Sequence, residues 1–185
     1  MFKKMRAIKK KVQLWCRNII ESIVYRIVKK RSIIRNPGKI VFVCGGNICR
    51  SAFAEKLLKA EADGSFPVIE SCGIDVEVRS PSPCEAVCAA GKIGLDLGHH
   101  LSRGIERCDL EGADLILAME YRQYRKLIES FPHKGRQIKL LREFAPFPEN
   151  LLCNIDDPFG NNERAFEKCF AQIQRSISAI KMLIR

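Results

Sequence analysis

The sequence lacks the features that mark membrane-spanning, secreted and zinc-binding proteins. It has no run of about 20 uninterrupted apolar residues, the length that a transmembrane helix requires. It also lacks an apolar signal region followed by a small-residue cleavage site, so a secretory signal is not expected. Neither a paired Cys-x2-Cys motif nor a set of histidine ligands occurs, and we expect no metal and no cofactor.

The 9 cysteines are an odd number in a chain without a secretory signal. Disulfide frameworks form in oxidising compartments, whereas thiols stay reduced in the cytosol. The cysteines therefore predict a cytoplasmic protein rather than a secreted protein held by disulfides.

Acidic residues are nearly absent from the first 38 residues, which hold 12 Lys or Arg and 1 Glu, a net charge of +11. Residues 39–185 hold 20 basic and 20 acidic residues, so their net charge is zero. Asn36, Pro37 and Gly38 favour a break in regular structure between the two parts. We predict a basic extension over residues 1–38 and one domain over residues 39–185, long enough for its own hydrophobic core.

Apolar residues recur along the extension at three- and four-residue steps, which predicts a basic amphipathic helix over residues 5–30. We call these residues the apolar stripe: Phe2, Met5, Ile8, Val12, Trp15, Ile19, Ile23 and Ile27, with Lys3, Lys4, Lys10, Lys11 and Arg17 lying off it.

A stripe of this kind beside basic residues, with a tryptophan, is typical of a helix lying on an anionic membrane surface. We therefore favour peripheral attachment to the inner face of a membrane through residues 1–36. The alternatives are packing on the domain or on a second copy, an organelle-targeting peptide, and nucleic-acid binding. Nucleic acid is not expected, because charge alone is weak evidence. If the membrane interpretation holds, removing the extension should leave hydrolysis of a small soluble substrate nearly unchanged.

Strand and helix patterns alternate along residues 39–185. We predict strands at 39–43, 67–71, 114–119 and 137–140, and helices at 52–62, 82–93, 120–130 and 162–184. This alternation predicts an α/β fold, in which a parallel sheet has helices on both faces and a site at the C-terminal edge of its strands.

Residues 39–55 place a thiol, a turn and a guanidinium around one point. Their apolar run ends at Cys44, a loop of small residues follows, and Arg50 and Ser51 come just before a helix-forming segment. The N–H groups of such a loop and the N-terminus of the helix favour an anion, and the planar guanidinium matches two phosphate oxygens. The same groups would stabilise a thiolate at Cys44, which makes it a candidate nucleophile.

The residues after Cys44 are expected to give the loop its shape. Gly45 and Gly46 can adopt backbone angles that other residues resist, and Asn47 is the next most tolerant of a left-handed conformation. We expect these three residues to turn successive N–H groups inward.

Residues 43–51, followed by Ala54 and Glu55, resemble the signature of the low-molecular-weight protein tyrosine phosphatases. Further stretches in the family's order extend the resemblance to the C-terminus, at residues 71–73, 94–103, 113–119 and 157–159. The resemblance implies a phosphotyrosine phosphatase I-like fold with four parallel strands. It also implies hydrolysis of phosphomonoesters through a phosphocysteine intermediate, with phosphotyrosine proteins as substrates.

The resemblance assigns roles to single residues. Cys44 would be the nucleophile, Arg50 would hold the phosphoryl group and Asp157 would be the general acid. The phosphate-binding loop would comprise Gly45, Gly46, Asn47, Ile48, Cys49 and Ser51, supported by Ser71 and His100, with Phe159 in the substrate pocket.

Local chemistry agrees with the assignment of Asp157. Pro158 holds the preceding backbone extended and so positions the loop. Asp156 is adjacent, and a like charge this close would raise the pKa of one of the two carboxyls.

Two other functions compete with the phosphatase. Thioredoxin-coupled arsenate reductases resemble this loop but have two further cysteines just after the central strand, where residues 120–130 have none. A membrane-tethered phosphate-binding protein with little turnover is the second alternative. It would need neither Cys44 nor Asp157, so the presence of both favours the phosphatase.

Overall fold

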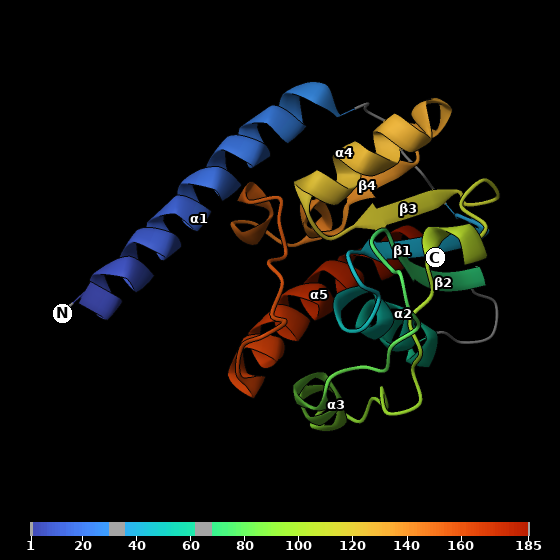
Figure 1. Ribbon diagram of the computed structural model, residues 1–185. Coiled ribbons are helices and arrows are strands. Elements are labelled where there is room, and N and C mark those ends of the chain that lie inside the picture. Colours follow the sequence, from blue (N-terminus) through green and yellow to red (C-terminus); the bar gives the residue numbers. More distant parts are fainter. Residues whose placement is uncertain (1, 30–35, 62–67, 185) are drawn as a thin grey trace.

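The computed structural model describes residues 2–29, 36–61 and 68–184 (Figure 1). Its centre is a sheet of four parallel strands in the order β2-β1-β3-β4. The strands are β1 Lys39–Cys44, β2 Val68–Gly73, β3 Leu115–Ala118 and β4 Ile138–Leu140. The prediction of a parallel four-stranded sheet is confirmed.

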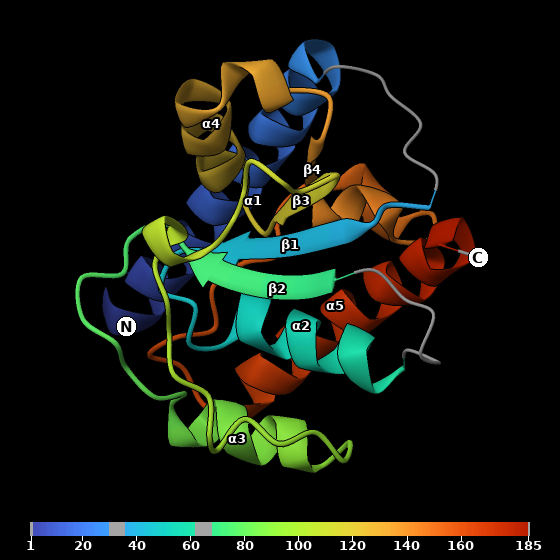
Figure 2. The same cartoon turned by 90° about the vertical axis from the view of Figure 1, so that its right-hand side faces the viewer.

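Helices cover both faces of this sheet, as predicted (Figures 1 and 2). One face packs against α2 Arg50–Ala60 and α5 Glu163–Ile184, with α3 Cys84–Gly91 lying farther out against α5, and the other packs against α4 Tyr121–Ser130 with α1 Phe2–Val28 beside it. Short 3-10 helices lie at Ile105–Arg107, Pro132–Lys134, Leu141–Phe144 and Glu149–Leu151. The predicted element ends at residues 30, 62 and 67 lie outside the described residues.

The position of β1 inside the sheet explains its unbroken apolar run. Ile40, Phe42 and Cys44 belong to the core formed with α2 and α5, whereas Val41 and Val43 belong to the core formed with α4. Because a central parallel strand is buried on both faces, both sets of alternating side chains are apolar.

The carboxyl ends of the three longer strands meet at one edge of the sheet. Cys44 at the end of β1 pairs with Gly73 at the end of β2, and Val43 pairs with Ala118 at the end of β3. Glu120 follows two residues after β3, at the start of α4. The loops after these strands therefore converge where a parallel α/β sheet places its ligands.

The extension forms the predicted helix, α1, but α1 does not dock through its apolar stripe. Its buried side chains are Asn18, Ser22 and Tyr25, a narrow polar face. Six residues of the stripe lie in solvent, whereas Ile19 is half-buried: Met5 is 59%, Ile8 55%, Val12 52%, Trp15 60%, Ile23 55% and Ile27 76% exposed. The extension therefore packs on the domain, one of the sequence-based alternatives, but through this polar face and not through the stripe.

The two faces of α1 could not be distinguished by periodicity, because residues 18, 22 and 25 also follow three- and four-residue spacing. Within the described parts of the chain, neither α1 nor any other helix has the length and apolar character needed to cross a membrane. Whether residues 1–38 are a separate unit stays a prediction.

Tyr25 of α1 contacts Tyr124, Leu140 and Glu143. Its ring packs edge-on against Tyr124 of α4, with ring centroids 5.0 Å apart. Its hydroxyl donates to the Glu143 carboxylate and accepts from the Leu140 N–H at 3.1 Å. Burial and the Glu143 charge raise the pKa of Tyr25, so its hydroxyl keeps the hydrogen that it donates.

Tyr25→Phe should lower the free energy of unfolding by about 1–3 kcal/mol, because it leaves the buried Leu140 N–H and the Glu143 carboxylate without their partner. Urea unfolding followed by circular dichroism measures the change. Tyr121→Phe is the matched control, since no hydrogen bond of the Tyr121 hydroxyl occurs among the described residues, and it should change stability by less than about 0.5 kcal/mol. Equal effects of the two substitutions would contradict the role given to the Tyr25 hydroxyl.

Candidate active site

The loop between β1 and α2 brings Cys44, Asn47 and Ser51 into contact. The Cys44 thiol is buried, at 1% exposure. Its Sγ lies 3.0 Å from Ser51 Oγ and accepts from the Asn47 N–H at 3.2 Å. Both neighbours can donate to sulfur, so the surroundings stabilise a negative charge there.

The backbone of this loop differs from expectation at its glycines. Asn47 takes the left-handed conformation, with φ at 51°, as predicted. Gly45 and Gly46 do not have positive φ, and a Cβ at either would meet its nearest neighbours only at ordinary contact distance. The prediction that these glycines are needed for unusual backbone angles is therefore wrong, and the tight turn depends on Asn47.

The glycine that the loop does require is Gly73, at the end of β2. A Cβ there would lie 2.5 Å from the Gly45 carbonyl oxygen and 2.9 Å from the Asn47 nitrogen. Any side chain at this position would push the loop away from the sheet. Sequence reasoning included Gly73 only as part of a resemblance, because close approach of two segments has no local signal.

A directional chain of hydrogen bonds leads from Glu55 to Cys44. Ser71 Oγ donates to Glu55 Oε2 at 2.5 Å, and therefore accepts from Asn47 Nδ2 at 2.8 Å. The second hydrogen of Asn47 Nδ2 goes to Ser51 Oγ, also at 2.8 Å. The Ser51 oxygen is thereby fixed as an acceptor from Asn47, and its own hydrogen has two acceptors in reach, Cys44 Sγ at 3.0 Å and the Cys72 carbonyl oxygen at 3.3 Å.

Charged neighbours keep Glu55 ionised although it is buried. Lys59 Nζ lies 2.5 Å from Oε1, and Arg103 Nη2 lies 3.3 Å from Oε2. Burial opposes the charge, but hydrogen bonds from Lys59 and Ser71 and the charge of Arg103 outweigh it and hold the pKa of the carboxyl below its usual value.

The remaining polar groups of Asn47 are also engaged, and one of them bonds to His100. The Arg103 N–H donates to Asn47 Oδ1 at 3.0 Å, which defines the orientation of the amide. His100 Nε2 lies 2.6 Å from the Asn47 carbonyl oxygen. Burial lowers the pKa of His100, and because a carbonyl can only accept, the neutral ring donates from Nε2. The structure thus places both predicted support residues, Ser71 and His100, on Asn47.

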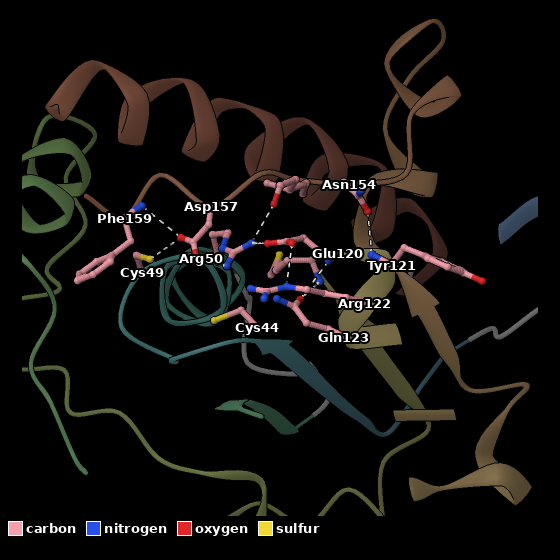
Figure 3. A network of polar contacts seen from close by, with 12 residues as sticks. Cys44, Cys49, Arg50, Glu120, Tyr121, Arg122, Gln123, Asn154, Asp157 and Phe159 are labelled. Carbon is pink, nitrogen blue, oxygen red and sulfur yellow. Dashed lines mark hydrogen bonds and ion pairs between the residues drawn. The ribbon is translucent and has the colours of Figure 1, made fainter. Parts of the chain in front are cut away.

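Arg50 is buried at 1% exposure between two carboxylates (Figure 3). Nη1 donates to the Glu120 carboxylate and to the Ile155 carbonyl at 3.0 Å, and Nη2 to Asp157 Oδ2 at 2.5 Å. Burial disfavours the charge, but the neighbouring Cys44, Asp157 and Glu120 outweigh it and raise the pKa of Arg50. Its Nε has no partner among the described residues, which leaves a buried donor for an anion.

Glu120 is a site residue that the sequence analysis missed. It caps α4 through a reciprocal capping box with Gln123, and its carboxylate also accepts from Arg122 Nε at 3.1 Å. Glu-x-x-Gln directly after the central strand was a readable signal for a helix start at the edge where the site lies. Its ion pair with Arg50, 70 residues earlier in the chain, could not be predicted from the sequence.

Asp157 and Asp156 have different environments. The Asp157 side chain is 38% exposed, bonds to Arg50 and accepts from the Phe159 N–H at 3.2 Å. Asp156 is half-buried, and burial followed by the charge of Glu120 raises the pKa of its carboxyl. The predicted cause, repulsion between the two adjacent aspartates, is therefore not the one observed.

Cys49 and Phe159 flank Asp157. Cys49 Sγ lies 3.9 Å from Asp157 Oδ1, and burial, together with the Cys44 charge, raises the pKa of Cys49 to about 12. Phe159 is 59% exposed. Cys49 is therefore a neutral thiol beside the acid, while the Phe159 ring is accessible for contact with a ligand.

Cys72 and Cys108 are neighbours beside the sheet, but the described residues do not form a metal-binding cluster. Across residues 2–29, 36–61 and 68–184, no three His, Cys, Asp or Glu side chains could hold a metal ion. Helix α4, which follows the central strand, has no cysteine, and Cys84 and Cys88 lie exposed on α3. The arsenate reductase alternative is not favoured.

Comparison with known proteins agrees with this geometry. Residues 39–184 match the family model described as low molecular weight phosphotyrosine protein phosphatase. The chain is 34% identical over 140 residues to the "Probable low molecular weight protein-tyrosine-phosphatase EpsP" of Ralstonia solanacearum, covering 76% of this chain and 91% of that protein. It is 31% identical over 137 residues to the low molecular weight protein-tyrosine-phosphatase Wzb of Escherichia coli K12, covering 74% and 88%.

A solved structure has the same fold. The crystal structure of the Erwinia amylovora tyrosine phosphatase amsI superimposes with a TM-score of 0.69 at 26% identity, covering 80% of this chain and 95% of that one. With the model match over residues 39–184 and a relative above 30% identity, the chain belongs to the low molecular weight phosphotyrosine protein phosphatase family.

Proposed function

We propose that this chain is a protein-tyrosine phosphatase that hydrolyses phosphomonoesters through a phosphocysteine intermediate on Cys44. One arrangement supports this most: a buried thiol with donors aimed at it, beside a buried guanidinium with an unpaired N–H. A thiolate and a dianion would both be stabilised there. The phosphate-binding protein without turnover requires neither a polarised thiol nor the nearby carboxylate.

In the first step, Cys44 Sγ attacks phosphorus, an S–P bond forms and the P–O bond to the leaving group breaks. Arg50 and the N–H groups of the loop hold the equatorial oxygens, where negative charge is spread in the transition state. The start of α2 at Arg50 adds the positive end of the helix dipole. The ion pair with Glu120 keeps the guanidinium in place and orients its fork.

Asp157 is the proposed acid and base. It gives a proton to the leaving oxygen in the first step, then takes one from the water that attacks the phosphocysteine and breaks the S–P bond. Its partly exposed carboxyl, held by the Phe159 N–H at the edge of the site, suits contact with both a leaving group and water.

Phosphotyrosine in proteins is the proposed substrate. The curated relatives are named protein-tyrosine phosphatases, and the exposed Phe159 ring beside Asp157 could pack against a phenyl ring.

Cys44→Ser should reduce p-nitrophenyl phosphate hydrolysis by about 10³-fold or more while retaining binding of inorganic phosphate, because the hydroxyl is a poor nucleophile in this setting. Arg50→Lys should also be severely impaired, since lysine lacks the planar fork. Release of p-nitrophenol measures hydrolysis, and calorimetric titration measures the binding of inorganic phosphate. Cys88→Ser, on the exposed face of α3, is the control and should be active. Substantial hydrolysis by Cys44→Ser would show that Cys44 is not the nucleophile.

Asp157→Asn should lower kcat/KM for phenyl phosphate by about 10²–10⁴-fold and affect p-nitrophenyl phosphate less, because the better leaving group needs less protonation. Asp156→Asn is the matched control, with the same change one residue earlier. If Asp156→Asn causes the loss and Asp157→Asn does not, the two carboxyls have been assigned the wrong way round.

We further propose that α1 attaches the enzyme, in the cytoplasm, to an anionic membrane surface. Six residues of the apolar stripe are exposed, Arg6, Lys9 and Arg17 are exposed on the same helix, and residues 1–38 have a net charge of +11. Apolar insertion and attraction of several basic residues, each worth about 1 kcal/mol near the surface, act together. The N-terminal part of α1 extends past the carboxyl ends of the strands, so attachment would hold the site near membrane-bound phosphoproteins (Figures 1 and 2).

Val12→Glu should reduce sedimentation of the full chain with vesicles of anionic lipid, because it places a charge within the stripe. Gln13→Glu is the matched control: it adds the same charge at a neighbouring exposed residue off the stripe, and should bind more strongly than Val12→Glu. Binding should weaken as salt screens the attraction. A full chain that stays in the supernatant at low salt would rule the membrane proposal out.

A further inference from the structure

Helix α1 binds the chain segment that leads directly into Asp157. Ser22 Oγ accepts from the Cys153 N–H at 2.9 Å, and Asn18 Oδ1 accepts from the Asn154 N–H at 3.4 Å. Ser22 in turn donates to the Asn18 carbonyl at 2.5 Å, one turn earlier in the helix. Two successive N–H groups of a segment without regular structure are thus held by side chains of α1.

Asn154 connects this contact to the start of α4. Its side chain is fully buried, with Nδ2 donating to the Glu21 carboxylate and Oδ1 accepting from the Tyr121 N–H at 2.8 Å (Figure 3). Tyr121 directly follows Glu120, whose carboxylate holds Arg50. A displacement of Asn154 would therefore move the residue that orients the guanidinium.

The residue after Asn154 lies against Arg50 itself. The Ile155 N–H donates to the Met119 carbonyl at 2.8 Å, and the Ile155 carbonyl accepts from Arg50 Nη1 at 3.0 Å. Asp157 follows two residues later. Residues 153–157 are thus held by α1 at one end and by Arg50 at the other.

We propose that Asn18 and Ser22 are positioning residues for the reaction: through Cys153 and Asn154 they hold the segment that places Asp157 and Arg50. Both lie outside residues 39–184, the part of the chain that matches the family model. The inference rests on the proposed role of Asp157 as the acid. It replaces the expectation that the extension can be removed without loss of activity.

A displaced Asp157 and a smaller amount of folded protein change the kinetics in different ways. Fewer folded molecules would lower the rates on all substrates equally. A displaced acid would lower kcat/KM more for a poor leaving group than for a good one, because only the poor leaving group depends strongly on protonation. The informative quantity is therefore the ratio of kcat/KM for phenyl phosphate to that for p-nitrophenyl phosphate.

The test compares full-length Ser22→Ala and Asn18→Ala/Ser22→Ala with the unchanged chain and with Ser178→Ala. Ser178 is the matched control, since its hydroxyl also donates one turn back along its helix, to Gln174 at 2.9 Å, but is exposed. We expect the ratio to fall roughly tenfold in the double variant, by less in Ser22→Ala, and not at all in Ser178→Ala. Hydrogen exchange of the Cys153 amide should quicken in Ser22→Ala.

Two results would overturn the proposal, and they are distinguishable. If Asp157→Asn lowers the ratio but the folded Asn18→Ala/Ser22→Ala variant does not, α1 is only an attachment and the positioning role is wrong. If Asp157→Asn itself leaves the ratio unchanged, the acid assignment fails and the inference fails with it. Should the double variant not fold, an unchanged ratio in Ser22→Ala decides against the proposal.

Discussion

The hydrogen bonds of the Asn47 side chain are the constraint on which the candidate site depends. A non-glycine residue in the left-handed conformation costs about 1–3 kcal/mol, so the turn persists only if its surroundings compensate. Here the amide bonds to Ser71, Ser51 and the Arg103 N–H, each buried hydrogen bond contributing about 0.5–1.5 kcal/mol. Because the amide is fully satisfied in one orientation only, it holds the turn and, with the turn, the Asn47 N–H that donates to Cys44 Sγ.

The second constraint is electrostatic. A buried guanidinium is costly unless its charge is paired and its N–H groups are bonded. Glu120 and Asp157 provide the charges, while the Ile155 carbonyl fills a third direction. One of these carboxylates is buried and caps a helix, whereas the other is partly exposed on an irregular segment. The ion pair of Arg50 with Glu120 is therefore rigid, whereas its ion pair with Asp157 is adjustable. This suits a guanidinium that holds phosphoryl oxygens whose negative charge changes during the reaction.

What could be predicted from the sequence was local. Cys44, Arg50 and Ser51 are close in the chain. The strand pattern before them and the helix pattern after them indicate that a turn lies between. Glu120 and Gly73 act through contacts between distant segments, for which the sequence has no short-range signal. The face by which α1 contacts the domain could not be predicted for another reason: two faces of the helix share helical spacing, and the one that is buried is the polar one.

The attachment of α1 has a chemical peculiarity. Most of its partners on the domain are backbone groups: the N–H groups of Leu140, Cys153 and Asn154 and the carbonyl oxygens of Asn150 and Leu151, which accept from Arg26. Backbone groups are present whatever side chain a position bears. At these five positions the helix therefore recognises the path of the chain and not its side chains, so side-chain identity is constrained mainly where α1 meets Tyr124, Glu143 and Asn154.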